Sequence, residues 1–250
     1  MSVNVGRHDT VAVVTIDRQE ALNALNVETL TALRDRLREL AEDDSARVVV
    51  LTGAGERAFV AGADIKYMSG LGSDAAKEWG ALGHETARLL EEMPKPTIAA
   101  INGFALGGGC ELALGCDLRY ASSRAGLGQP EIKLGIVPGW GGTQRLARIC
   151  GLGVAKELVF TGQQVDAERA LQIGLVNAIA DPVLDHALEV AQRLAAMSPV
   201  ALRVAKRLLN LSPDALEREA EEFGDLFASE DAKEGLAAFA EKRAPRFVGR

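Results

Sequence analysis

Apolar residues fall into short strand-like runs and amphipathic stretches over the first two thirds of the chain. The runs Val11–Asp17 and Val48–Thr52 are short, rich in β-branched residues and bounded by turn residues, as strands are. Between them, leucines recur every three or four residues and predict a helix over Val27–Glu42 with one apolar face. Thr97–Ile101 and Leu118–Ala121 are two further predicted strands. Strands that alternate with helices indicate an α/β fold.

The pattern changes after about Val176, where strand-like runs end and helical patterns remain. Four helices are predicted, over Pro182–Met197, Pro199–Asn210, Pro213–Ala228 and Glu230–Arg243. Three of them begin with a proline in or next to the first turn, where its missing N–H costs nothing, and Ser198 and Ser212 are suitable N-caps. We therefore expect these helices to form a separate layer or an assembly module.

Composition and charge narrow the possible functions. The net charge is −7, whereas nucleic acids and anionic membranes favour a basic surface, so we expect neither as a partner. Cys110, Cys116 and Cys150 form no disulfide framework, and the three histidines lie too far apart in sequence for a metal-ligand spacing. No apolar stretch approaches the roughly 20 residues of a membrane span, and no targeting pattern is present. A soluble cytoplasmic protein without a metal is therefore expected.

The most informative stretch is NGFALGGGCELAL at 102–114, in which a strand runs into three consecutive glycines and then into an apolar helix. Glycine lets the backbone approach a ligand closely, and a helix start offers unpaired N–H groups, although a tight packed turn would need the same glycines. Neither a phosphate loop nor a dinucleotide fingerprint is present. Glu111 lies in the first turn of this helix, where it suits the helix dipole. Its apolar neighbours indicate burial, however, and a buried carboxylate is costly unless it is used.

A second glycine-rich stretch, GQPEIKLGIVPGWGGT at 128–143, carries another acidic residue, Glu131, and leads into a predicted helix over Thr143–Ile149. Alone, Glu131 could be an ordinary surface residue. Two glutamates in glycine-rich, apolar settings suit general acid–base catalysis at one reacting centre. A third stretch at 58–66 is small and apolar up to Ala63 and then polar, which by itself indicates only the end of a strand.

Together these stretches resemble a known family. The segments FVAGADIKYM at 59–68, NGFALGGGCELAL at 102–114, GQPEIKLGIVPGWGGTQRL at 128–146 and AFAEKRAPRF at 238–247 are similar to the crotonase (enoyl-CoA hydratase/isomerase) superfamily, in order and over nearly the whole chain. The resemblance implies an α/β fold with a spiral of repeated ββα units. It also implies a C-terminal helical region that drives homotrimers, usually paired into homohexamers. On this basis the chain divides into a CoA-binding catalytic domain at 1–195 and a helical oligomerisation region at 196–250.

The resemblance also assigns roles to residues. The backbone N–H groups of Ala63 and Gly108 would form an oxyanion hole for the thioester carbonyl, on which negative charge grows during the reaction. Glu111 would deprotonate water and Glu131 would deliver a proton to C2, or both would share one water network. Contacts with the acyl-CoA substrate would come from Ala61, Ile65, Lys66, Met68, Gly139 and Lys242, the last across a subunit interface. No cofactor is implied, because CoA is part of the substrate.

The presence of both glutamates favours an enoyl-CoA hydratase. It would add water across C2=C3 of a trans-2-enoyl-CoA to give the (3S)-3-hydroxyacyl-CoA, in fatty acid or related acyl-CoA degradation. The alternatives are an isomerase of the same fold, which generally keeps only the later glutamate, and a non-catalytic member that binds CoA or RNA. Gly139 is glycine as in hydratases, whereas dienoyl-CoA isomerases carry an acid there.

The sequence sets no acyl chain length. Trp140 would either shape the acyl pocket or simply pack against its neighbours. The segment from Tyr67 to Met93 is expected to cap the pocket, and its glycines at 70, 72, 80 and 83 favour a mobile segment.

Overall fold

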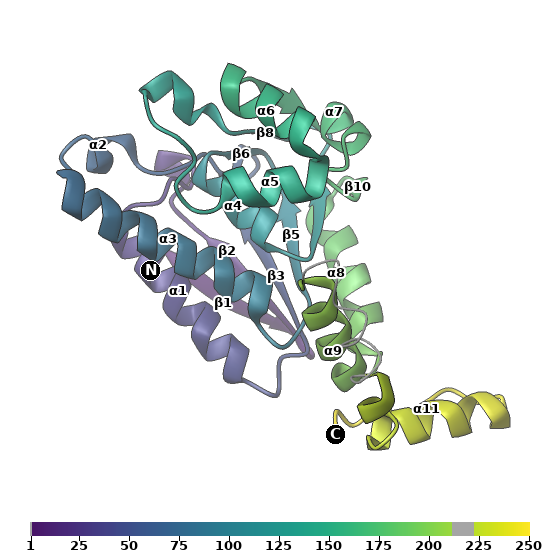
Figure 1. Cartoon of the computed structure of the whole chain (residues 1–250). Helices are drawn as coiled ribbons and strands as arrows, with labels where there is room; N and C mark the ends of the chain where they lie inside the picture. Colours follow the sequence, from purple (N-terminus) through teal and green to yellow (C-terminus); the bar gives the residue numbers. More distant parts are fainter. Residues whose placement is uncertain (1, 212–222) are drawn as a thin grey trace.

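The strands of the chain are divided between two sheets (Figure 1). The computed structural model describes residues 2–211 and 223–250. The larger sheet has the strand order β1-β2-β3-β5-β7-β10, and the smaller sheet has the order β4-β6-β8-β9. The strands are β1 (Val3–His8), β2 (Val11–Ile16), β3 (Val48–Gly53), β4 (Ala58–Val60), β5 (Thr97–Ile101), β6 (Phe104–Leu106), β7 (Leu118–Ala121), β8 (Gly126–Gly128), β9 (Gln164–Asp166) and β10 (Ala178–Ile179).

Helical segments lie between the strands and after them along the chain. The α-helices are α1 (Val27–Glu42), α2 (Ile65–Met68), α3 (Ser73–Glu92), α4 (Gly108–Gly115), α5 (Gly142–Cys150), α6 (Leu152–Thr161), α7 (Ala167–Gln172), α8 (Val183–Ala195), α9 (Pro199–Leu209) and α11 (Glu230–Glu241). There are also two short 3₁₀ segments, η1 (Gln19–Ala21) and η2 (Pro130–Leu134), and residues 223–226 are helical.

Successive strands alternate between the two sheets. β3, β5 and β7 enter the larger sheet, and the strands that follow them, β4, β6 and β8, enter the smaller one. The pairs are followed by α3, α4 and α5, with the short segments α2 and η2 before α3 and α5. Apart from the antiparallel pair β1–β2, the larger sheet is parallel. This arrangement is the spiral of ββα units that the sequence resemblance implies, and the predicted fold class is confirmed.

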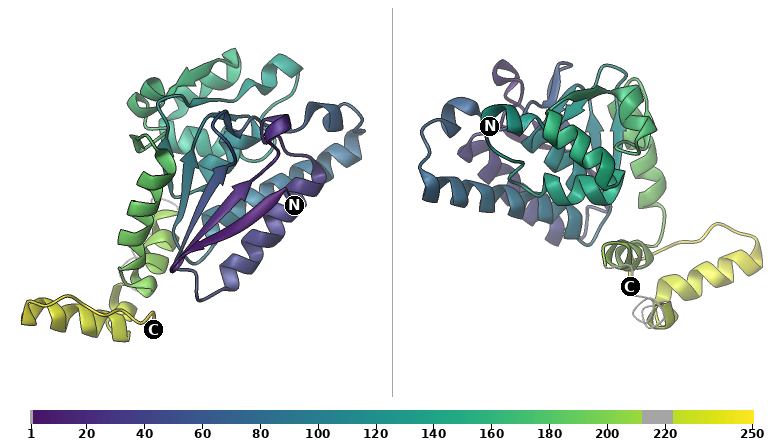
Figure 2. Two further views of the ribbon diagram at one scale, coloured as in Figure 1. Left: turned by 180° about the vertical axis from the view of Figure 1, so that it is seen from behind. Right: turned by 45° about the horizontal axis from the view of Figure 1, so that its top comes forward.

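Helices cover both faces of the larger sheet, with α1 and α3 on one side and α8 on the other (Figure 2). On β3, Val48 and Val50 belong to the core that includes the apolar residues of α8. The alternate residues Val49 and Leu51 belong to the core shared with α1 and α3. Because neither face meets water, β3 is buried at every position, which explains why its apolar run is visible in the sequence.

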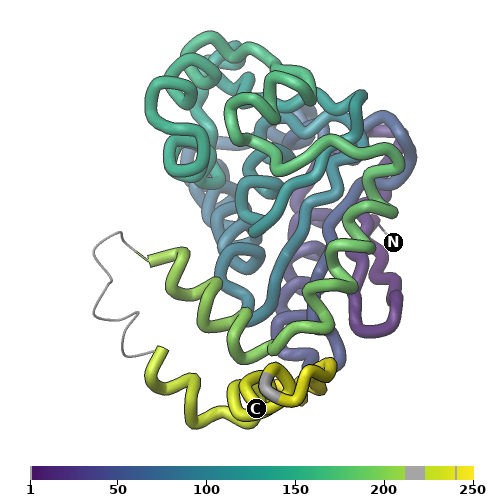
Figure 3. Tube along the Cα trace, turned by 90° about the vertical axis from the view of Figure 1, so that its right-hand side faces the viewer, coloured from purple at the N-terminus to yellow at the C-terminus, as the bar shows by residue number. Residues whose placement is uncertain are grey.

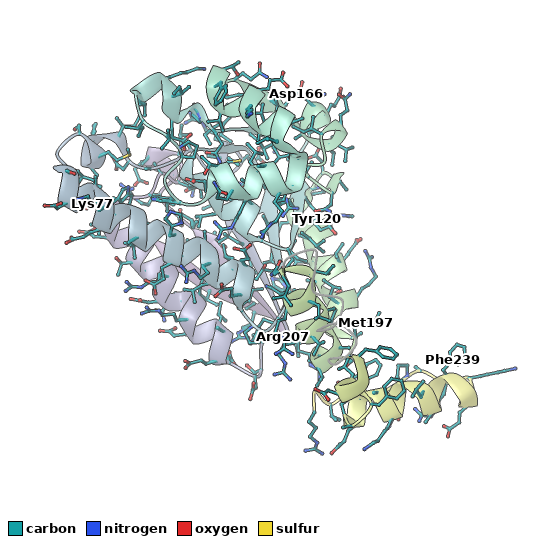
Figure 4. All side chains as sticks on the ribbon, in the orientation of Figure 1. Lys77, Tyr120, Asp166, Met197, Arg207 and Phe239 are labelled. Carbon is teal, nitrogen blue, oxygen red and sulfur yellow. The ribbon has the colours of Figure 1, made fainter. Side chains whose placement is uncertain are left out.

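The C-terminal helices differ in how they meet this core. α8 packs directly on the sheet, and α9 begins beyond it at Ser198, whose Oγ accepts a hydrogen bond from Ala201 N at 3.1 Å. Lys206 fastens α9 to the core, because its Nζ lies 2.8 Å from both Asp117 Oδ2 and the Leu90 carbonyl oxygen. α11 lies below the sheets in Figures 1 and 3, and Figure 1 shows it extending away from them. Its Phe239 is 88% exposed, and Figure 4 labels this side chain on the helix.

Most of the predicted elements are observed, several with the predicted bounds. The prediction that strands end after about Val176 is wrong, since Ala178–Ile179 pairs with β7 as β10, a strand too short to leave a pattern. β1 was not predicted, because only Val3 among its residues is buried. Much of the segment expected to be mobile is the helix α3, which contains Gly80 and Gly83. The predicted helix over Pro213–Ala228 lies mostly outside the described residues.

Candidate active site

A cavity of about 660 Å³ lies between α2, α3 and the segment 130–140, and it reaches the start of α4. Most of the site residues predicted from the sequence line this cavity: Ala61, Ala63, Ile65, Met68, Gly108, Glu111, Glu131 and Gly139. The structure therefore brings together segments that are separated by up to 78 positions, from Ala61 to Gly139. Two predicted contacts, Lys66 and Lys242, are not among the lining residues.

The glycines at 107–109 shape the turn between β6 and α4. Gly107 has a φ of +51°, a left-handed conformation that favours glycine. A β-carbon on Gly109 would lie only 2.0 Å from the Val60 carbonyl oxygen, so α4 starts directly against β4. The turn is thus fixed by both conformation and close approach, as expected for a backbone that presents N–H groups to a ligand.

Ala63 and Gly108, the two proposed oxyanion donors, have free backbone amides. Within the described part of the chain, no backbone or side-chain acceptor bonds Ala63 N or Gly108 N. The neighbouring amides are occupied, since Asp64 N donates to the Leu25 carbonyl at 2.7 Å and Gly107 N donates to the Gly128 carbonyl at 2.9 Å. The surrounding backbone is therefore held in place while two donors remain available to a substrate oxygen.

Glu111 is held rigidly at the inner end of the cavity. The residue is only 1% exposed, and its Oε1 accepts hydrogen bonds from Trp140 N and Gly142 N, each at 2.7 Å. Burial raises the pKa of Glu111, while the two N–H donors and the positive charge of Arg145 act in the opposite direction. Because both contacts go to Oε1, these donors leave Oε2 free to bind water.

Glu131 lies at the other side of the glycine turn, in η2. A β-carbon placed on Gly107 would be 2.8 Å from its Oε1, which puts this carboxylate beside the turn that carries Gly108. Burial raises the pKa of Glu131 to about 7, and the nearby charge of Glu111 adds to the effect. The buried side-chain amide of Gln129 lies against the Glu131 carboxylate; with the amide oriented so that its N–H faces Glu131, it donates to Oε1 at 3.0 Å.

Arg145, a residue that the sequence did not single out, supports the Glu111 environment from behind. Its Nη1 donates to the Trp140 carbonyl at 2.9 Å, so it anchors the residue whose N–H bonds Glu111. Its Nη2 lies 2.6 Å from Glu91 Oε2, and the side chain is largely buried. No local pattern marks such a residue, because Glu91 lies 54 positions away in the sequence.

The two lysines predicted to contact CoA have different positions. Lys66 is an exposed residue of α2, and its amide bonds Asp64 Oδ1 at 3.1 Å in the N-terminal cap of that helix. Asp64 also pairs with Arg18 Nη2 at 3.4 Å. Lys242 follows α11, which lies away from the cavity within the same chain (Figure 1). A contact between Lys242 and CoA thus stays a prediction that requires a second subunit. Lys133, which was not predicted, lines the cavity.

The ββα spiral carries two backbone N–H groups without an acceptor among the described residues and two carboxylates in the same cavity. Such an arrangement can stabilise an oxyanion and move protons beside it. The family model described as enoyl-CoA hydratase/isomerase matches residues 6–250, and the chain belongs to this family. The chain is 47% identical to the short-chain-enoyl-CoA hydratase of Clostridium acetobutylicum, with 97% of this chain and 95% of the relative covered. It is 45% identical to the crotonyl-CoA hydratase of Syntrophomonas wolfei, with 98% and 96% covered. The crystal structure of an enoyl-CoA hydratase from Bacillus anthracis matches with a TM-score of 0.96 at 38% identity and covers both chains completely.

Proposed function

We propose that Glu111 and Glu131 together perform the hydration that this chain catalyses as an enoyl-CoA hydratase. The observation that carries the assignment is their placement in one cavity, beside a glycine turn whose Gly108 N–H has no acceptor among the described residues. The relatives named short-chain-enoyl-CoA hydratase and crotonyl-CoA hydratase, at 47% and 45% identity, support the reaction. The substrate is a trans-2-enoyl-CoA, and the product is the (3S)-3-hydroxyacyl-CoA.

The reaction begins with the thioester carbonyl oxygen, which accepts hydrogen bonds from Ala63 N and Gly108 N. These donors withdraw electrons from the conjugated alkene and stabilise the enolate-like state that forms when water attacks C3. Glu111, fixed through Oε1, orients the water through Oε2 and removes its proton. Glu131, whose pKa of about 7 leaves a large protonated fraction at neutral pH, delivers a proton to C2. The step needs no cofactor, because the thioester itself activates the alkene.

The surroundings of this centre support acyl-CoA as the ligand. Ala61, Ile65 and Met68 provide a lining for the CoA portion, and Lys66 and Lys133 offer positive charge for its phosphates. Within residues 2–211 and 223–250, no helix combines the length and the apolar character that a bilayer crossing requires. We place the protein in the cytoplasm, acting in the degradation of fatty acids or related acyl-CoA compounds.

The C-terminal region at 196–250 is proposed to assemble the chain into homotrimers or homohexamers. α11 carries Leu236 at 59% exposure and Phe239 at 88% exposure, and it extends away from the core (Figure 1). Apolar side chains of this size are normally covered, and a second copy of the chain is the partner that the family resemblance implies. Such an assembly would also bring Lys242 of one subunit toward the cavity of another.

Turnover of crotonyl-CoA tests the proposed reaction directly. Loss of enoyl absorbance, with formation of the (3S)-3-hydroxy product, is expected from the wild-type protein. A 3-enoyl-CoA serves as the comparison substrate, because an isomerase of the same fold would move its double bond by a proton shuttle through Glu131 alone. Rapid isomerisation beside poor hydration would reject the hydratase assignment. The absence of both reactions with intact CoA binding would favour a non-catalytic member.

A further inference from the structure

Three aromatic rings pack in a row beside the cavity, and two of them line it. The ring of Tyr67 lies 5.0 Å from that of Trp79 on α3, and Trp79 lies 5.2 Å from Trp140, measured between ring centroids. Trp79 and Trp140 line the cavity, and they are 7% and 3% exposed. We refer to Tyr67, Trp79 and Trp140 as the aromatic wall.

The Trp140 ring is confined on two sides by glycines. A β-carbon on Gly83 of α3 would lie 2.2 Å from ring atoms Cγ and Cδ1, and one on Gly108 would lie 2.2 Å from Cζ3. The ring therefore fills the gap between α3 and the start of α4, directly beside the proposed oxyanion donor. Packing this tight leaves the ring no space to give way to a ligand.

The backbone closes the cavity next to this wall. A β-carbon on Gly80 of α3 would lie 3.7 Å from the Gly139 carbonyl oxygen, an ordinary van der Waals distance. The helix and the segment 130–140 are thus already in near contact at this point. An acyl group bound at Gly108 therefore meets the Trp140 ring, which fills the space between α3 and α4, and beside it the near contact of Gly80 with Gly139.

We propose that the aromatic wall restricts the acyl group to short chains such as crotonyl, with Trp79 and Trp140 as the specificity-determining residues. The inference rests on the hydratase reaction proposed above. In a pocket with open apolar room, each additional buried methylene would improve kcat/KM about fourfold. Where the room is already filled by packed rings, extra methylenes displace side chains instead, and binding is weakened.

The wild-type protein provides the first test. Values of kcat/KM are measured for the trans-2-enoyl-CoA thioesters with four, six, eight and ten carbons. A maximum at crotonyl-CoA with a steep decline toward the octenoyl and decenoyl compounds is expected. A flat or rising series would overturn the proposal. Failure to hydrate any member of the series would instead reject the hydratase function, so the two failures are distinguishable.

Substitutions in the wall provide the second test. Trp79→Ala removes a lining ring from α3, whereas Glu111 and Glu131 lie on α4 and η2, and it should raise the ratio of octenoyl to crotonyl kcat/KM at least about tenfold. Trp79→Phe keeps an aromatic ring in the wall and is the matched control, with a ratio near that of the wild type. Trp140→Ala keeps the backbone N–H that bonds Glu111 and should shift the ratio in the same direction. An unchanged ratio of octenoyl to crotonyl kcat/KM in the folded Ala variants would overturn the assignment of Trp79 and Trp140. If neither variant folds, the wild-type series decides whether the pocket prefers short chains.

Discussion

Glu111 can be changed in two ways that separate its chemistry from its contribution to stability. Its Oε1 accepts hydrogen bonds from two buried backbone N–H groups, those of Trp140 and Gly142, at 2.7 Å each. Glu111→Gln removes the negative charge but retains an oxygen that can accept both hydrogen bonds. Glu111→Ala removes the oxygen as well, so both N–H groups lose their partner and a small cavity forms.

The expected magnitudes follow from these contacts. A positioned acid or base contributes about 10²–10⁴-fold to the rate, so Glu111→Gln should lower hydration by that factor. Its stability should be unchanged or higher at pH 8, because a carboxylate with a raised pKa destabilises the folded state once it is ionised. Each unpaired buried N–H costs about 1–3 kcal/mol, so Glu111→Ala should lose roughly 2–6 kcal/mol of unfolding free energy in addition to activity.

Two measurements on the same samples decide the outcome. Hydration is followed by the loss of enoyl absorbance of crotonyl-CoA, and unfolding is followed by urea denaturation monitored by circular dichroism. Undiminished hydration by Glu111→Gln would contradict the role of Glu111 as the base. A Gln variant as unstable as the Ala variant would show that the two hydrogen bonds are not retained, and its loss of activity could then not be assigned to charge.

The remaining predictions concern Glu131, Gly108, Lys206 and the assembly. Because the pKa of Glu131 is raised to about 7, its protonated form is lost above pH 7 and kcat/KM should fall in that range. The residual activity of Glu131→Gln should lack this fall with pH. Gly108→Pro and Gly108→Ala both place a β-carbon against Trp140, but only proline removes the backbone N–H. The Pro variant should therefore be about 10²–10³-fold slower than the Ala variant in single-turnover assays. Equal rates for the two variants would remove this donor from the mechanism. Lys206→Met leaves Asp117 without its cation, and urea denaturation should show a loss of about 3 kcal/mol of unfolding free energy. An unfolding free energy unchanged within error would mean that the ion pair does not fasten α9. Light scattering should give three or six times the 26.5 kDa subunit mass, and a monomer at micromolar concentration would refute the assembly.

The sequence predicts those parts of the molecule that depend on local pattern. α1 has the predicted bounds because its leucines recur with the helical period, and β3 is recognisable because both of its faces are buried. The strands β4, β6 and β8 have only three residues each, too few for a period, so the second sheet could not be predicted from the pattern of apolar residues. The family resemblance supplied the spiral that local patterns could not.

The site shows the same division between local and distant information. Glu111 and Glu131 are recognisable because each stands in a distinctive glycine-rich stretch. Gly83 was interpreted as a source of mobility, whereas in the structure it gives space to the Trp140 ring, 57 residues further along the chain. A glycine that permits motion and a glycine that permits contact look alike in a single sequence, because the difference lies in a partner that only the fold supplies.

The two glutamates are supported in different ways, and the difference agrees with their proposed roles. Glu111 is almost fully buried and bound by two backbone N–H groups whose segment is anchored by Arg145, which suits a group that must hold water in one orientation. Glu131 is half-buried in a short 3₁₀ segment, and its carboxylate lies against the buried side-chain amide of Gln129. A carboxyl group that gives up a proton in every cycle must regain one from solvent, and partial exposure with a pKa near neutrality permits this exchange. Rigid support for the base and solvent access for the acid are therefore the structural basis for assigning Glu111 and Glu131 to separate steps.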